Sequence, residues 1–159
     1  MHRLHQLMPV PARAADFVLR FALALVLFYA SADKLLHPQD FAAIVTGYHV
    51  LPEALVNPVA IWLPWLELLL GLSLVSGYWS EGAVTLTAGL FAVFWVLMIV
   101  SAARGIDVNC GCFSTKPADP SAEPTPMFFY IGRDAVLLGL ALFTAWVRLV
   151  VVKEEGAKG

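Results

Sequence analysis

Long runs of hydrophobic residues alternate with shorter polar segments along the whole chain. Four of the runs are about 20 residues long, the length that an α-helix needs to cross the hydrocarbon core of a bilayer. A helix satisfies its own backbone amides and carbonyls, so it is the form that such a run adopts in lipid. We therefore predict an all-α membrane protein, an up-down bundle of four transmembrane helices. The predicted spans are residues 15–36, 58–77, 82–103 and 128–152.

The segment between the first two spans is neither fully apolar nor a polar loop. From Phe41 to Leu51 its apolar residues recur at intervals of three and four, the spacing of one helix face. Asp40 stands where a carboxylate favours a helix N-terminus, and Pro52 follows the last apolar position. We predict a short amphipathic helix here. It lies along the membrane surface, packs over the mouth of the bundle, or does both.

Composition narrows the class of protein further. Hydrophobic residues make up 60% of the chain and charged residues only 14%, whereas soluble domains carry roughly 25% charged residues. A net charge of -2 excludes the basic footprint of a nucleic-acid-binding protein. The length of 159 residues predicts a single membrane domain covering residues 1–159. The first apolar run is too long for the core of a signal peptide, so we expect it to remain as the first span.

Basic residues are somewhat more frequent on the side of the membrane that both termini share. By the positive-inside rule we expect a multi-pass protein of the inner (cytoplasmic) membrane with both termini in the cytoplasm. The polar loop 104–127 then lies outside the cytoplasm, where disulfides persist. The basic residues compared are Arg3, Arg13, Arg148, Lys153 and Lys158 on the terminal side, against Lys34, Arg104 and Lys116 on the other, with Arg133 slightly inside the last span.

The two cysteines of the chain lie two positions apart in this loop, with Gly111 between them and Phe113 after them. A disulfide between Cys110 and Cys112 closes a small strained ring, and strain makes the bond prone to exchange. A bridge over one residue also removes little chain entropy, so a stability role explains it badly. We predict that Cys110 and Cys112 are the catalytic pair of a thiol–disulfide exchange site. Gly111 permits the tight backbone that the bridge needs.

Two other interpretations of the pair stay open. In the first, the protein is a non-catalytic membrane assembly or anchoring partner, and an inert disulfide shapes the loop. In the second, Cys110 and Cys112 bind Cu(I), which two thiolates suit, or the chain is part of a transport system. No histidine lies in loop 104–127 to help such a metal site, and the chain does not present the four ligands of a structural zinc site.

Charged residues inside the predicted spans are further candidates. Glu67 lies near the middle of the second span, where an unpaired carboxylate costs at least a few kcal/mol. We predict that it faces the bundle interior and pairs with Arg133 or Arg20, with Arg133 favoured. Lys34 is expected to extend to the lipid headgroups, or to bias the potential beside the cysteine loop. The charge pair has two possible roles that the sequence does not separate: it fixes the register of the helices, or it helps to ionise a cysteine thiol.

These pieces together resemble the MauE family, within the broader DoxX-like group of small four-span membrane proteins. The resemblance covers most of the chain, from about Arg20 to Arg133, and the Cys-Gly-Cys stretch is its most specific part. Ser114 departs from the glycine expected after that stretch. The matching pieces are Arg20, Asp33-Lys34-Leu35, Phe41, Tyr48, Leu51-Pro52, Leu63 to Leu68, Gly71, Asn109 to Phe113 and Arg133-Asp134.

The family is associated with maturation of a periplasmic, disulfide-rich enzyme subunit together with a thioredoxin-like partner. The resemblance therefore implies a role in making or shuttling disulfides in an extracytoplasmic client. It carries over neither the identity of the client nor a cofactor. A quinone electron acceptor is an option by analogy with four-span disulfide generators, but those use a second cysteine pair and this chain has two cysteines in all.

Overall fold

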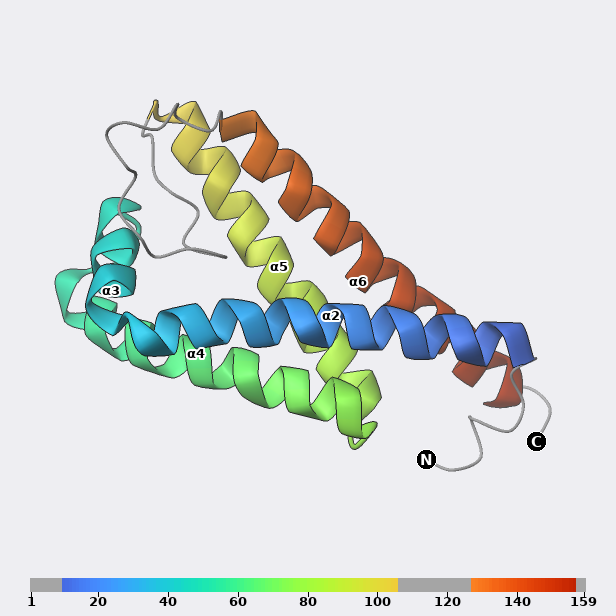
Figure 1. Cartoon of the computed structure of the whole chain (residues 1–159). Coiled ribbons are helices and arrows are strands. Elements are labelled where there is room, and N and C mark those ends of the chain that lie inside the picture. Colours follow the sequence, from blue (N-terminus) through green and yellow to red (C-terminus); the bar gives the residue numbers. More distant parts are fainter. Residues whose placement is uncertain (1–9, 106–126, 157–159) are drawn as a thin grey trace.

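The protein is described by a computed structural model that covers residues 10–105 and 127–156, with the side chains of residues 15–105 and 128–148. Within these residues every regular element is an α-helix, and Figure 1 shows their arrangement. The helices are α2 (Val10–Leu36), α3 (Pro38–Gly47), α4 (Glu53–Ser76), α5 (Ser80–Ala103) and α6 (Met127–Gly156).

Four of the helices are long and apolar enough to cross a membrane, which confirms the prediction of an all-α four-span protein. The second span begins at Glu53, earlier than the predicted residue 58, because Pro58 lies inside α4 instead of starting it. Pro52, in an extended conformation, precedes the helix. The four candidate spans are Ala15–Leu36, Glu53–Ser76, Ser80–Ala103 and Phe128–Arg148.

The long helices pack as two pairs. Helix α2 has its main contact with α4, and α5 has its main contact with α6. In Figure 1 the two pairs are inclined to each other, and successive spans run in opposite directions. The N-terminal end of α2 and the C-terminal end of α6 lie at one end of the molecule, while α3 lies at the other. We call these the terminal end and the α3 end.

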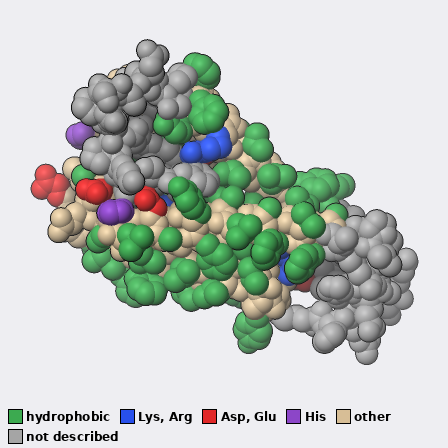
Figure 2. Space-filling view, in the orientation of Figure 1, with side chains coloured by type: hydrophobic (Ala, Val, Ile, Leu, Met, Phe, Trp, Pro, Cys, Tyr) green, Lys and Arg blue, Asp and Glu red, His purple; other side chains and the backbone are tan. Residues whose placement is uncertain are grey.

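Large apolar side chains cover the outside of the bundle, as expected for helices surrounded by lipid. Trp62 of α4 is 75% exposed, and many leucines, valines and phenylalanines of all four spans are also exposed. Figure 2 shows hydrophobic side chains along the length of α2 and α4, with charged side chains and histidines gathered mainly toward the α3 end. The interior is filled mainly by smaller and aliphatic residues such as Leu23, Ala24, Leu74 and Val84.

The predicted amphipathic helix is present as α3, with a proline in its first turn. It packs against α4 and α2 and buries Phe41, while Tyr48 just after it is buried against α5. Packing over the end of the bundle is therefore confirmed. The placement of α3 along a membrane surface stays a prediction.

The connection between α4 and α5 is a tight turn, Gly77 to Trp79. Gly77 ends α4 in the left-handed conformation, with φ of 70°, which favours glycine because it has no Cβ. Its amide donates to the carbonyl of Ser73 at 3.1 Å. This turn brings the start of α5 to the terminal end of the bundle.

Candidate functional site

A buried ion pair joins the first two spans near the α3 end. The Nζ of Lys34, in the last turn of α2, lies 2.9 Å from both carboxylate oxygens of Glu67 in α4. Lys34 is 0% exposed and Glu67 only 2%. An unpaired charge at such a site is costly in a membrane, so each group offsets the desolvation of the other. The pair fixes the register of α2 against α4.

The surroundings of the ammonium group add to this pairing. Lys34 also donates to the carbonyl of Ala30 at 3.4 Å, one turn earlier in α2. Its Nζ lies 5.4 Å from the ring centre of Phe41 in α3 and 5.8 Å from that of Phe94 in α5, within the range of cation–π attraction. A cation also suits the C-terminal end of a helix such as α2. Lys34 therefore links four helices: α2, α3, α4 and α5.

Two predictions about these charges are corrected by this geometry. Glu67 does face the bundle interior, as predicted, but it pairs with Lys34 and not with Arg133 or Arg20. Lys34 points inward to Glu67 instead of extending to the headgroups. The reason is the antiparallel packing of α2 and α4, which sets the end of the first span beside the middle of the second.

Arg133 and Asp134 form a second charged group in the first turns of α6. Both Nε and Nη2 of Arg133 donate to Oδ1 of Asp134, at 3.0 and 2.8 Å. The Arg133 guanidinium also stacks over the ring of Tyr130, 5.3 Å from its centre. Asp134 is 4% exposed and Arg133 is partly exposed. The buried carboxylate of Asp134 is thus neutralised by the guanidinium of its neighbour Arg133.

Tyr48 connects α3 to the second helix pair. Its hydroxyl donates to the sulfur of Met98 in α5 at 3.3 Å, and its ring packs in a cluster with Phe94 and Met98. Tyr130 and Ile131 of α6 border the same cluster. Burial, reinforced by the negative charge of Asp134, raises the pKa of Tyr48 to about 12. Tyr48 is therefore a neutral phenol at physiological pH.

A small cavity lies between the two carboxylates. Glu67 and Asp134 both line it, together with Phe91 and Phe94 of α5 and aliphatic side chains of α2 and α6. Its volume of about 20 Å³ is enough for about one water molecule. The quinone option gains no support from it.

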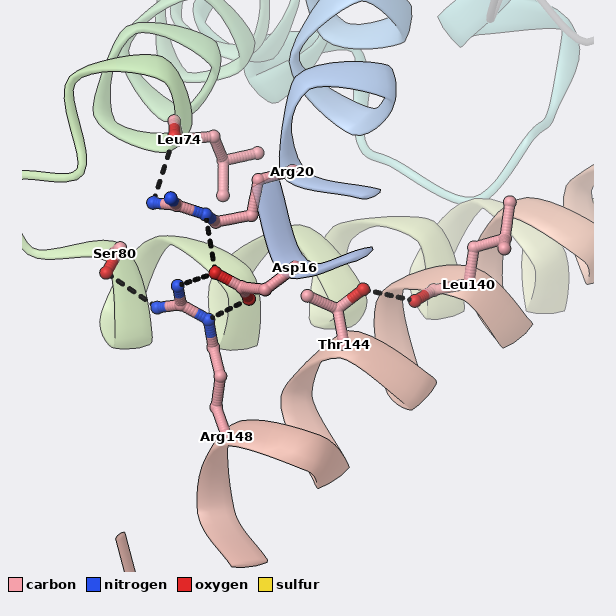
Figure 3. A network of polar contacts seen from close by, with 7 residues as sticks. All are labelled: Asp16, Arg20, Leu74, Ser80, Leu140, Thr144 and Arg148. Carbon is pink, nitrogen blue, oxygen red and sulfur yellow. Dashed lines mark hydrogen bonds and ion pairs between the residues drawn. The ribbon is translucent and has the colours of Figure 1, made fainter. Parts of the chain in front are cut away.

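A third charged cluster lies at the terminal end, where Figure 3 shows it in detail. Nε and Nη2 of Arg148 donate to the two oxygens of Asp16 at 2.8 and 2.7 Å, and its Nη1 donates to Ser80 at 2.6 Å. Arg20 approaches the same carboxylate at 3.1 Å. Sequence reasoning missed this cluster because Asp16 and Arg148 are 132 positions apart. One part of the cluster could have been predicted from the sequence. Asp16 lies four residues before Arg20, so the two side chains share one face of the helix and can form an ion pair.

The predicted catalytic pair, Cys110 and Cys112, lies outside the described residues, as do the supporting residues Gly111 and Phe113. The segment that contains them starts after α5, which ends at Ala103, and leads into α6. Both of these helix ends lie at the α3 end in Figure 1. The described residues contain no cluster of three or more side chains that could hold a metal ion. The Cu(I) interpretation concerns the two cysteines and stays a hypothesis.

The fold and the buried charges define a multi-pass membrane protein with four spans, a helix over one end and an ion pair beneath that helix. Comparison with known proteins identifies its family. The family model described as "Methylamine utilisation protein MauE" matches residues 12–147. The chain belongs to the MauE family.

Three curated relatives illustrate the similarity. The methylamine utilization protein MauE of Methylorubrum extorquens is 32% identical over 129 residues, which are 80% of this chain and 67% of the relative. The protein of the same name from Methylophilus methylotrophus is 33% identical, over 80% of this chain and 66% of the relative. The one from Paracoccus denitrificans is 31% identical, over 81% and 67%. The match thus spans about two thirds of the length of these relatives. No solved structure matches the chain.

Proposed function

We propose that the protein is a membrane-embedded thiol–disulfide exchange protein whose Cys110 and Cys112 cycle between dithiol and disulfide. It assists disulfide formation in an extracytoplasmic client and works with a thioredoxin-like partner. The observation that carries the proposal is the Cys110-Gly111-Cys112 sequence, which holds both cysteines of a chain that belongs to the MauE family. The names of the curated relatives refer to methylamine utilisation in those organisms.

The electrons of the exchange reaction balance among the client, this protein and the thioredoxin-like partner. A thiolate of the client attacks the Cys110–Cys112 disulfide, forms a mixed disulfide with one of these cysteines, and releases the other as a thiolate. The second client thiolate then attacks the mixed disulfide, so that the client leaves oxidised and the pair is left as a dithiol. The disulfide form of the thioredoxin-like partner accepts the two electrons by the same reaction in reverse. No bound cofactor is needed for this cycle.

The arrangement of α3 and the Lys34–Glu67 pair at the α3 end supports this proposal. The end of α5 and the start of α6, which flank the cysteine segment in the sequence, lie at the same end as α3 and the Lys34–Glu67 pair. Phe41 of α3 lies against Lys34, and Tyr48 lies against Met98 of α5. We assign Lys34 and Glu67 a positioning role: they hold α2, α3 and α4 together beneath the face where the exchange takes place. Arg133 belongs to the first turns of α6 on that same face.

The inner-membrane location with cytoplasmic termini belongs to the same proposal. It rests on the bias of basic residues toward the terminal side. It places the cysteine segment in an oxidising compartment, where a disulfide can form and exchange.

Trapping of the mixed disulfide tests the proposal directly. Cys110→Ser and Cys112→Ser are expressed singly, because replacing the resolving cysteine stabilises the mixed disulfide with a partner or client. We expect one of the two variants to give a higher-mass band on non-reducing gels that disappears with dithiothreitol. The Cys110→Ser, Cys112→Ser double variant is the control, since it leaves the chain without any sulfur nucleophile other than methionine.

Two outcomes contradict the proposal. If neither single variant forms a trapped species and the double variant still supports oxidation of the client, the non-catalytic anchoring role is correct. If purified wild-type protein holds one copper per chain and the double variant holds none, the pair is a metal site instead.

A further inference from the structure

The cluster of Asp16, Arg20 and Arg148 at the terminal end has no part in the proposed exchange reaction. All three side chains are nearly buried: 10% of the Asp16 side chain is exposed, 9% of Arg20 and 15% of Arg148. Two guanidinium groups share one carboxylate, so the cluster carries one positive charge in excess (Figure 3). In a membrane protein, such an uncompensated charge calls for an anion.

The excess charge belongs mainly to Arg20. Arg148 uses both sides of its guanidinium, on the two oxygens of Asp16 and on Ser80. Arg20, in contrast, donates among the described residues only a long bond of 3.5 Å, to the carbonyl of Leu74. Its Nε lies 3.1 Å from Asp16, but it is buried and makes no well-directed hydrogen bond to any described residue. Arg20 thus has donor capacity that the described part of the protein does not use.

The start of α5 adds to the positive potential at this place. Ser80, which accepts from Arg148, is the first residue of α5, and the preceding Trp79 provides no side-chain cap. The first backbone amides of a helix lack partners within the helix, and they lie at the positive end of its dipole. Glu81 of the same turn is exposed and forms no ion pair with the described side chains, although its carboxylate offsets part of this potential.

Aromatic side chains indicate the level of the membrane surface here. Tyr78 and Trp79, in the turn before α5, are 79% and 60% exposed, and Trp146, near Arg148 on α6, is 62% exposed. Exposed tryptophan and tyrosine side chains gather at the headgroup level of a bilayer. Lipid phosphates lie at the same level. Basic pockets between transmembrane helices are known to bind the headgroups of acidic lipids.

We propose that Arg20, Arg148 and the start of α5 form a binding site for the phosphate of an anionic phospholipid. Arg20 supplies the unused hydrogen-bond donors. Arg148, held in place by Asp16 and Ser80, lines the site and adds its positive charge. The lipid neutralises the excess charge and joins α2, α5 and α6 at the terminal end. The site is independent of the cysteine chemistry at the other end of the bundle.

Competition between two lipids tests this site. The wild-type protein is purified in detergent, mixed with equal amounts of phosphatidylglycerol and phosphatidylcholine, and analysed by native mass spectrometry. We expect it to retain phosphatidylglycerol in preference. Arg20→Gln removes the excess charge but keeps the Asp16–Arg148 pair, and it lowers that preference by about fivefold, the effect of one basic side chain near a lipid surface. Arg104→Gln is the matched control, because Arg104 is an exposed arginine at the opposite end of α5. This control keeps the wild-type preference.

Arg20→Lys separates charge from packing, because it keeps the excess charge and is expected to keep most of the preference. Equal retention of the two lipids by the wild type, or equal loss in the Arg20→Gln and Arg104→Gln variants, overturns the site. A final arm adds inorganic phosphate to the lipid-free protein. If phosphate alone raises the melting temperature as much as phosphatidylglycerol does, the site binds free anions and the lipid assignment is wrong.

Discussion

At the scale of single residues, Lys34 and Glu67 depend on each other more than either depends on its own helix. Each is buried, and the distance of 2.9 Å to both carboxylate oxygens leaves no room for a bulk-water shell between the charges. The presence of a buried acid in the second span was predictable from Glu67 alone, since a charge in an apolar run requires a partner. The identity of the partner was not predictable, because the sequence contains several basic residues near span ends and only the packing of α2 on α4 selects Lys34.

A double-mutant cycle on this pair gives a prediction. Glu67→Gln leaves the Lys34 ammonium buried without its carboxylate, and Lys34→Met leaves the reverse. We expect each single change to lower the free energy of unfolding by about 3–5 kcal/mol. The double variant removes both charges and is expected to be more stable than either single variant. Unfolding of the purified protein in a detergent series, followed by circular dichroism, measures this. Additive losses in the double variant contradict direct pairing.

At the scale of elements, the contact between α2 and α4 is held close by Gly71. A Cβ built at Gly71 lies 2.7 Å from Cε1 of Phe28 in α2, nearer than real atoms approach. The four spans themselves were predictable from the length of the apolar runs, and so was α3 from the spacing of Phe41 and its successors. The pairing of α2 with α4 was not, because apolar residues on all sides of each span leave no single face that the sequence marks as buried.

Alanine substitution tests the close approach at Gly71. Gly71→Ala forces the Phe28 ring to move, and overpacking of this kind costs about 1–3 kcal/mol. Gly139→Ala in α6 is the matched control, because a Cβ there meets nothing within 4 Å and alanine favours a helix over glycine. We expect a lower melting temperature for Gly71→Ala and an unchanged or slightly higher one for Gly139→Ala. Equal melting temperatures for the two variants would show that α2 and α4 can separate without loss.

At the scale of the whole molecule, the bundle has two chemically different ends. The α3 end bears the Lys34–Glu67 pair and leads into the segment with the cysteines, while the terminal end bears the arginine cluster and the turn with Tyr78. Four spans that alternate in direction put the start of α2 and the end of α6 on one side. The cysteines and Tyr78 are therefore expected on opposite sides of the membrane, and labelling can tell which side is which.

Labelling with a membrane-impermeant maleimide tests this orientation in intact spheroplasts and in inverted vesicles. Wild-type protein, after mild reduction, is expected to react through Cys110 and Cys112 in spheroplasts only. The matched variant carries Tyr78→Cys with Cys110→Ser and Cys112→Ser, so that its single thiol lies in the exposed turn at the other end. That thiol is expected to react in inverted vesicles only. The reverse pattern keeps the four-span bundle but places the termini outside, and the cysteines then face the reducing cytoplasm, where a standing disulfide does not persist. Labelling of both thiols from one side contradicts the bundle itself, because an odd number of crossings must separate the turn before α5 from the segment after it.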